Sequence, residues 1–107
     1  FLDNETLDWF CEKYLPEPGE RQDWRASPLL AGPFDDLPTA VLITAGCDPL
    51  TDDCKAYASA LESAGVPVTL HEFDGMVHGF FTLGKLFRQS AEAVELAGKA
   101  LEAALTR

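Results

Sequence analysis

The stretch TAVLITAGCDPL, residues 39–50, decides the fold of this chain. Its first nine residues form an apolar run of strand length, which is typical of a strand buried on both faces in a parallel sheet. Asp48 and then Pro49 and Leu50 follow the run directly. The stretch therefore predicts a buried strand that delivers a carboxylate to one edge of a sheet.

A helix and a second strand are predicted after this stretch. Asp52 and Asp53 suit the positive end of a helix dipole, and Gly65 is a natural helix stop. Residues 66–73 have the composition of a strand, and residues 74–79 are predicted to be a loop that carries His78. The inner face of the helix is predicted to consist of Cys54, Tyr57, Ala58 and Leu61.

The two ends of the chain are predicted to be helical. Apolar residues within residues 5–14 have the spacing of a short amphipathic helix, and residues 19–38, which contain three prolines, predict an ordered loop. A long helix is expected from about residue 83 to residue 104. Its apolar stripe consists of Leu83, Leu86, Phe87, Val94, Ala97, Leu101 and Leu105.

The order strand, helix, strand predicts where Asp48 and His78 lie. Such a unit makes its two strands parallel, so both strands end at the same edge of the sheet. Open α/β sheets bind their ligands at that edge. Because Asp48 follows one strand and His78 follows the next, we expect the two side chains to meet there.

A carboxylate beside a histidine is the arrangement that activates a serine nucleophile. The histidine takes the proton of the serine, and the carboxylate orients the imidazole and stabilises its charge. The chain contains serines only at positions 27, 59, 63 and 90, and none has the flanking glycines of Gly-x-Ser-x-Gly. The sequence thus offers an acid and a base without a nucleophile.

Two motifs together resemble those of a known family. Residues 45–53, AGCDPLTDD, resemble the acid loop of the hormone-sensitive lipase family of bacterial esterases, although that family usually has another residue, often Arg, at the position of Thr51. Residues 75–80, GMVHGF, resemble its histidine loop. The resemblance covers essentially the whole chain. It implies an α/β fold in which residues 1–107 form the C-terminal portion of an α/β-hydrolase domain, with two parallel strands, a crossover helix and a long C-terminal helix.

The resemblance also implies a function. Asp48 becomes the acid and His78 the general base of a Ser-His-Asp triad in a carboxylic ester hydrolase, an esterase or lipase that acts on an ester substrate without metal or organic cofactor. Because the nucleophile precedes the acid in these hydrolases, the serine and the oxyanion loop are expected to precede Phe1. The chain alone is therefore predicted to be inactive.

Partners are predicted from the small sheet. Two strands with open edges are marginally stable, so residues 41–46 are expected to pair with a further strand. That strand would come from a missing N-terminal hydrolase segment, a second chain or a swapped copy. The resemblance also implies a homodimer that uses the last strand and the long helix.

Two alternative functions remain open at this point. One is a non-catalytic, truncated hydrolase module that acts in assembly or binding. The other is a divalent-metal site built from Asp48, Asp52, Asp53 and His78, because carboxylate oxygens bind Mg²⁺ and Ca²⁺.

The composition narrows the class of protein. A net charge of −10 argues against nucleic acid or an anionic membrane as partner, and no apolar run reaches the length that a membrane span requires. Cys11, Cys47 and Cys54 form neither a disulfide framework nor a zinc motif, which is typical of reduced thiols in a cytoplasmic protein. We expect a single domain at most.

Overall fold

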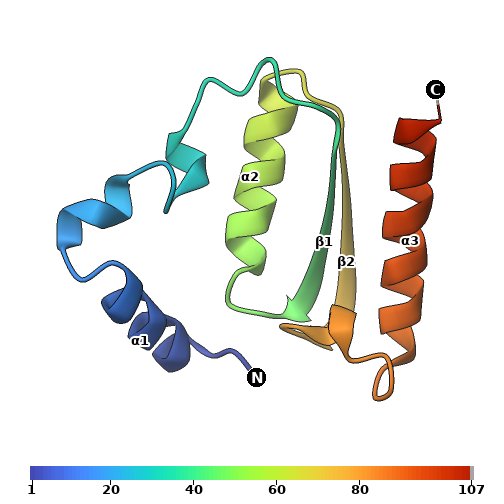
Figure 1. Cartoon of the computed structure of the whole chain (residues 1–107), viewed down its shortest axis with the longest axis horizontal. Coiled ribbons are helices and arrows are strands. Elements are labelled where there is room, and N and C mark those ends of the chain that lie inside the picture. Colours follow the sequence, from blue (N-terminus) through green and yellow to red (C-terminus); the bar gives the residue numbers. More distant parts are fainter. Residues whose placement is uncertain (107) are drawn as a thin grey trace.

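The computed structural model describes residues 1–106 and contains a two-stranded parallel sheet with a helix on each side (Figure 1). Strand β1 (Ala40–Cys47) pairs with strand β2 (Val68–Val77), and helix α2 (Thr51–Ser63) connects them. Helix α3 (Arg88–Leu105) lies on the opposite side of the sheet from α2. The predicted strand-helix-strand unit is confirmed.

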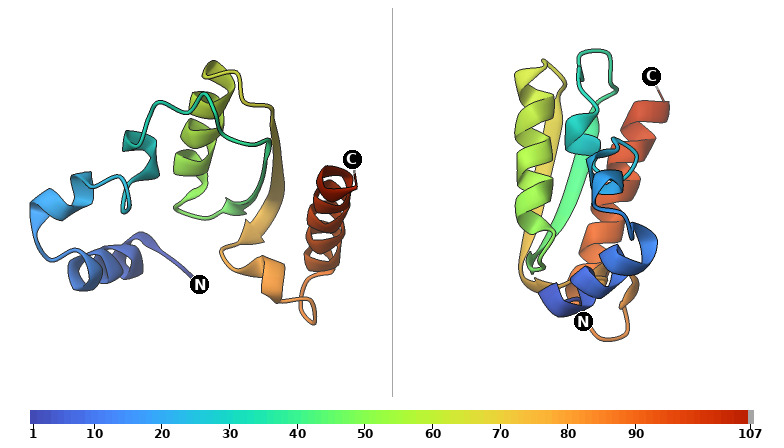
Figure 2. Two further views of the ribbon diagram at one scale, coloured as in Figure 1. Left: turned by 45° about the horizontal axis from the view of Figure 1, so that its top comes forward. Right: turned by 90° about the vertical axis from the view of Figure 1, so that its left-hand side faces the viewer.

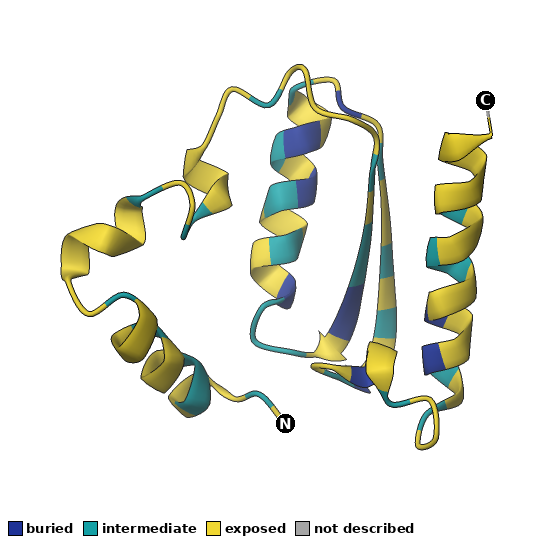
Figure 3. Cartoon of the chain, viewed as in Figure 1, coloured by how far each residue is buried: buried dark blue, intermediate teal, exposed yellow. Residues whose placement is uncertain are grey.

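The inner face of α2 is also confirmed. Ala58 and Leu61 are buried, and Cys54 and Tyr57 are half-buried (Figure 3). These positions recur every three or four residues, so they lie on one side of the helix and cover the sheet. An ion pair of 2.8 Å between Lys55 Nζ and Glu72 Oε2 joins the rim of α2 to β2.

Strand β2 is longer than the sequence predicted. The predicted loop at residues 74–79 was wrong for residues 74–77, which continue the strand as far as the pair Cys47–Val77. The register shifts between Ala45 and Cys47, and there a Cβ on Gly46 would lie 3.2 Å from Asp74 Cα. Because Gly46 has no side chain, the two strands approach closely enough to continue pairing.

The N-terminal third lies to one side of the sheet and its two helices (Figure 2). Helix α1 (Asn4–Tyr14) begins one residue before its predicted start, and the Asp3 carboxylate caps it by accepting a hydrogen bond of 2.8 Å from the Thr6 N–H. The predicted loop contains two short 3₁₀ helices, η1 (Pro18–Gln22) and η2 (Pro28–Leu30). Phe34 connects this segment to α2 through an edge-to-face contact with Tyr57, at 5.9 Å between ring centroids.

Helix α3 differs from its prediction in its start and in its buried face. It begins at Arg88, because residues 83–87 form turns in which the Phe87 N–H donates to the Leu83 carbonyl at 3.0 Å. Its buried residues are Ser90 and Ala93. Four residues of the predicted stripe, Leu86, Val94, Leu101 and Leu105, are exposed.

A buried core cluster lies at the C-terminal end of the sheet. Ala45, Met76, Phe80 and Ala93 form the buried core cluster, and the Phe73 ring packs against Phe80 in a tilted arrangement, at 5.2 Å between ring centroids. The ends of both strands, the short 3₁₀ helix η3 (Phe80–Thr82) and the first turns of α3 all contribute to it. This core supports the edge of the sheet at which Asp48 and His78 are found.

Candidate active site

Asp48 occupies a tight turn between β1 and α2. Its Oδ1 atom accepts a hydrogen bond of 2.9 Å from the Leu50 N–H, and its main-chain carbonyl accepts one of 3.2 Å from the Thr51 N–H. The side chain is only 12% exposed. The turn therefore fixes the carboxylate at the start of α2 and shields most of it from water.

His78 follows the last residue of β2 directly. The next residue, Gly79, has a φ of +80°, a left-handed conformation that glycine adopts without steric cost. The chain then enters η3, in which Phe80 is buried in the core. A strand end on one side and a buried aromatic ring on the other therefore anchor the histidine.

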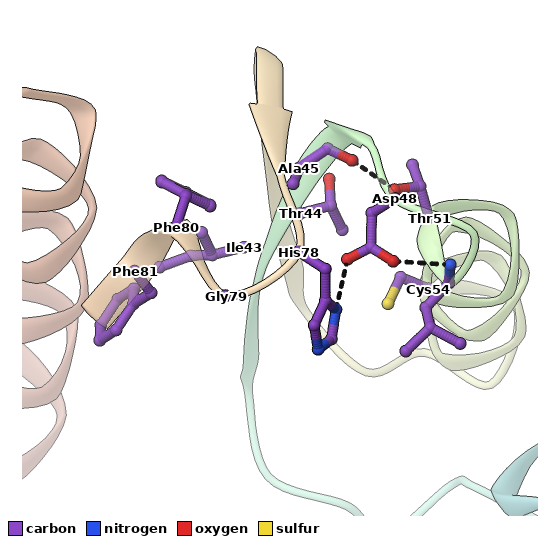
Figure 4. A pocket seen from close by; sticks show the side chains of 11 residues that line it. Ile43, Thr44, Ala45, Asp48, Thr51, Cys54, His78, Gly79, Phe80 and Phe81 are labelled. Carbon is purple, nitrogen blue, oxygen red and sulfur yellow. Dashed lines mark hydrogen bonds and ion pairs between the residues drawn. The ribbon is translucent and has the colours of Figure 1, made fainter. Parts of the chain in front are cut away.

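The two side chains meet at the edge of the sheet, as the topology predicted (Figure 4). His78 Nδ1 lies 2.8 Å from Asp48 Oδ2, and the imidazole is 45% exposed. A proton on Nδ1 satisfies this contact, so Nε2 carries the lone pair of the ring. Nε2 has no hydrogen bond to any other group in residues 1–106. The pair thus presents a basic nitrogen that a carboxylate orients from behind.

A cleft of about 270 Å³ adjoins this pair. Its lining is mostly apolar and consists of Ile43, Thr44, Ala45, Asp48, Leu50, Thr51, Cys54, His78, Gly79, Phe80 and Phe81. Burial raises the pKa of the Cys54 thiol, and the charges of Asp48 and Asp53 raise it further. Cys54 is therefore protonated at neutral pH, and a protonated thiol is a poor nucleophile.

No serine lines the cleft within residues 1–106. Ser27 donates a hydrogen bond of 2.6 Å to the Arg21 carbonyl, and Ser90 is buried and donates to the Phe80 carbonyl. The structure thus brings together the predicted acid and base and adds no serine to them. Their catalytic role stays a prediction.

Sequence reasoning missed two hydroxyl residues beside the site. Thr51 and Ser90 are both buried and donate to the carbonyls of Ala45 and Phe80, respectively. The one available signal was Ser90 itself, a small polar residue at the start of an otherwise apolar helix face.

The residues of the alternative metal site do not gather. In the described part of the chain, no three His, Cys, Asp or Glu side chains lie close enough together to hold a metal ion. Asp52 and Asp53 are exposed on the first turn of α2. Within the same residues, no helix has both the length and the apolar character needed to cross a bilayer.

Comparison with known proteins places the chain in a family. The family described as the α/β-hydrolase fold matches residues 1–82. Ethyl acetate hydrolase of Pseudomonas putida is 38% identical over 101 residues, which are 94% of this chain and 32% of the relative. Human hormone-sensitive lipase is 37% identical over 82 residues, which are 75% of this chain and 8% of the lipase.

A solved structure agrees with the sequence relatives. An α/β-hydrolase enzyme from the metagenome of Lake Arreo superimposes with a TM-score of 0.92 at 41% identity, covering 100% of this chain and 34% of that enzyme. The chain thus spans about a third of the length of this enzyme and of the Pseudomonas relative. From its fold and its relatives, the chain belongs to the α/β-hydrolase family, in the group of esterases that includes hormone-sensitive lipase.

Proposed function

We propose that this chain supplies the acid and the base of a Ser-His-Asp triad in a carboxylic ester hydrolase. The observation that carries the proposal is the 2.8 Å contact between Asp48 Oδ2 and His78 Nδ1. The other ring nitrogen of His78, Nε2, has no hydrogen-bond partner in residues 1–106. The family membership supports the reaction class, because the relatives are named as esterases and lipases.

The mechanism assigns proton transfer to His78 and charge stabilisation to Asp48. A serine from another segment of the hydrolase attacks the acyl carbon of an ester while Nε2 of His78 takes its proton. Asp48 stabilises the imidazolium that results, and the histidine then returns the proton to the alcohol that leaves. In the second half-reaction His78 takes a proton from the water that attacks the acyl-enzyme, and it returns this proton to the serine oxygen as the acyl–oxygen bond breaks and the acid is released.

The substrate is proposed to be a small carboxylic ester. The cleft beside His78 holds about 270 Å³ and is mostly apolar, which suits a short acyl or alkyl group. The name of the Pseudomonas relative, ethyl acetate hydrolase, supports an ester of this size.

We further propose that the chain is inactive alone and joins the remaining part of an α/β-hydrolase domain. Val41 on β1 and several large apolar residues of the N-terminal third, Trp9, Phe10 and Trp24 among them, are exposed. The close superposition on an enzyme about three times longer supports the same view, because there the additional chain is present. That part would cover these side chains, pair with the free edge of β1 and supply the serine.

A chimeric enzyme tests the proposal. Residues 1–107 would replace the matching segment of the Pseudomonas ethyl acetate hydrolase, and hydrolysis of p-nitrophenyl acetate would be measured. We expect the chimera to turn the ester over, and we expect neither this chain nor the truncated relative to do so alone.

A folded but inactive chimera would contradict the proposal. A chimera that shows a single cooperative melting transition and has no turnover would favour the non-catalytic module over the hydrolase. Restoring the relative's own segment in the same host provides the positive control for the assay.

A further inference from the structure

Two buried hydroxyl groups are bonded to segments adjacent to Asp48 and His78 in the chain, and neither belongs to the proposed triad. Thr51 is 7% exposed and Ser90 is 1% exposed. Each hydroxyl donates to a main-chain carbonyl of a residue that is itself buried, Ala45 for Thr51 and Phe80 for Ser90. The bond of Thr51 spans the turn that carries Asp48, and the bond of Ser90 joins η3, which begins two residues after His78, to α3.

Thr51 closes the turn that holds the acid. The turn leaves β1 after Cys47 and enters α2 at Thr51, so the bond from the Thr51 hydroxyl to the Ala45 carbonyl ties the strand directly to the helix. Asp48 lies between these two points and is itself bonded to the Leu50 N–H at 2.9 Å. A free Thr51 hydroxyl would leave the register shift after Ala45 and the start of α2 without this connection.

Ser90 stabilises the segment that follows His78, as Thr51 stabilises the turn that holds Asp48. The Phe80 carbonyl accepts both the Leu83 N–H at 2.9 Å and the Ser90 hydroxyl, so it joins η3 to the first turn of α3. Phe80 is only two residues from His78 and packs against Phe73 of β2. The bond therefore fixes the segment that leaves the histidine against the core.

We propose that Thr51 and Ser90 are positioning residues that hold the acid turn and the histidine turn at the separation the triad needs. The inference rests on the proposed function, since the reaction supplies its kinetic readout. Thr51 and Ser90 act by positioning Asp48 and His78. Ser90 is not among the residues that line the cleft, and the hydroxyl of Thr51, which does line it, is bonded to the Ala45 carbonyl. Small displacements of catalytic groups are costly, because a shift of about 1 Å lowers a rate by about 100-fold.

The test compares variants of the chimera described above. Thr51→Val keeps the shape of the side chain and removes the hydroxyl, and we expect kcat to fall by about 10- to 100-fold with KM within about twofold. Thr51→Ser keeps the hydroxyl and should restore most of kcat. Ser90→Ala provides an independent variant, with an expected loss of about tenfold. It also carries the test if Thr51→Val does not fold.

A spectroscopic signal separates this inference from the proposed function. The Nδ1 proton of His78, held by a carboxylate, should give a low-field proton resonance in the chimera. We expect Thr51→Val to weaken or broaden it and Thr51→Ser to preserve it. This comparison holds even if the parent chimera has no turnover, a result that would count against the proposed function alone.

Thr106→Val serves as the matched control. It also removes a threonine hydroxyl that donates to a main-chain carbonyl, in this case the carbonyl of Glu102 at the far end of α3. It should leave kcat and the resonance unchanged. The inference is overturned if Thr51→Val and Ser90→Ala lower the melting temperature but keep the kcat and the resonance of the parent. A loss that Thr51→Ser does not restore would overturn it for Thr51.

Discussion

Asp48 uses its two carboxylate oxygens for different purposes. Oδ1 accepts from the Leu50 N–H and fixes the side chain relative to α2, whereas Oδ2 contacts His78 Nδ1 at 2.8 Å. With a side chain that is 12% exposed, the carboxylate is weakly screened by water, so it stabilises a positive imidazole more than a surface carboxylate would.

Replacing this carboxylate should remove most of the activity of the chimera. Asp48→Asn leaves the shape unchanged but favours the wrong tautomer of His78, so kcat should fall on the order of 10⁴-fold. Asp52→Asn, the matched control at an exposed position, should keep kcat within about twofold. Equal losses in the two variants, measured with p-nitrophenyl acetate, would show that Asp48 has no special role.

Gly46 is required by close packing between strands. A Cβ there would lie 3.2 Å from Asp74 Cα and 3.2 Å from Gly75 N, which are backbone atoms that move only with β2. Gly46→Ala should therefore lower the free energy of unfolding by about 1–3 kcal/mol in urea titrations of the chimera. Gly19→Ala, with open space around the added Cβ, should change it by less than about 1 kcal/mol. A neutral Gly46→Ala would contradict the close approach.

Single residues were predictable from the sequence only where a motif marked them. Asp48 and His78 each follow a strand pattern, so topology alone placed them together. No motif indicates the hydrogen bonds of Thr51 and Ser90, although Thr51 lies within residues 45–53, because these bonds depend on carbonyls that only the folded chain brings near.

At the scale of elements, the central unit was predictable and two boundaries were not. Apolar runs and a helix period predicted β1 and α2, and they placed the start of the second strand at residue 66, two residues before its observed start at Val68. Asp74-Gly75 has the composition of a turn, and Gly75 does adopt a left-handed φ of +75°, but pairing with β1 resumes at Val77, so the dipeptide forms an irregularity within β2 and does not end it. Before α3, residues 83–87 form turns where a helix was predicted. The Ser90 hydroxyl, in the first turn of α3, donates to the Phe80 carbonyl across these turns.

One buried hydroxyl on β1 predicts a stabilising substitution. Thr44 is 5% exposed, and its Oγ1 has no hydrogen-bond partner in residues 1–106. Because an unpaired buried hydroxyl is costly, Thr44→Val should raise the free energy of unfolding of the chimera by about 1–2 kcal/mol. Thr39→Val, at an exposed position, should change it by less than about 0.5 kcal/mol. A less stable Thr44→Val would reveal a partner for this hydroxyl elsewhere in the chimera.

At the scale of the whole molecule, the chain is open. Its radius of gyration is 15.5 Å, whereas a compact domain of this size has a value of about 13 Å. Large apolar side chains remain exposed on α1 and on the far half of α3, where a groove of about 570 Å³ separates the helix from the sheet. The exposed apolar side chains support the proposed association with the remaining part of a hydrolase domain.

This openness predicts how the isolated chain behaves. Residues 1–107 alone should bind the dye ANS strongly, because their apolar side chains face water. Adding the N-terminal part of the Pseudomonas relative should reduce the dye fluorescence as the two parts associate. A chain that binds no dye and melts cooperatively alone would contradict the proposed association.

Part of this exposed surface was predictable from the sequence. A two-stranded sheet with an apolar run in it predicted a free edge at residues 41–46. The exposed stripe of α3 was not predicted, since periodicity shows that a helix has an apolar face and does not show what covers it.

The chain has only two histidines, and this offers the most direct test of the catalytic assignment. In the chimera, kcat for p-nitrophenyl acetate would be measured for His78→Gln and for His71→Gln, which changes the half-buried histidine within β2. We predict that His78→Gln lowers kcat on the order of 10⁴-fold or more and that His71→Gln keeps it within about threefold. A His78→Gln variant that folds and hydrolyses the ester as fast as the His71→Gln variant would contradict the assignment of the base.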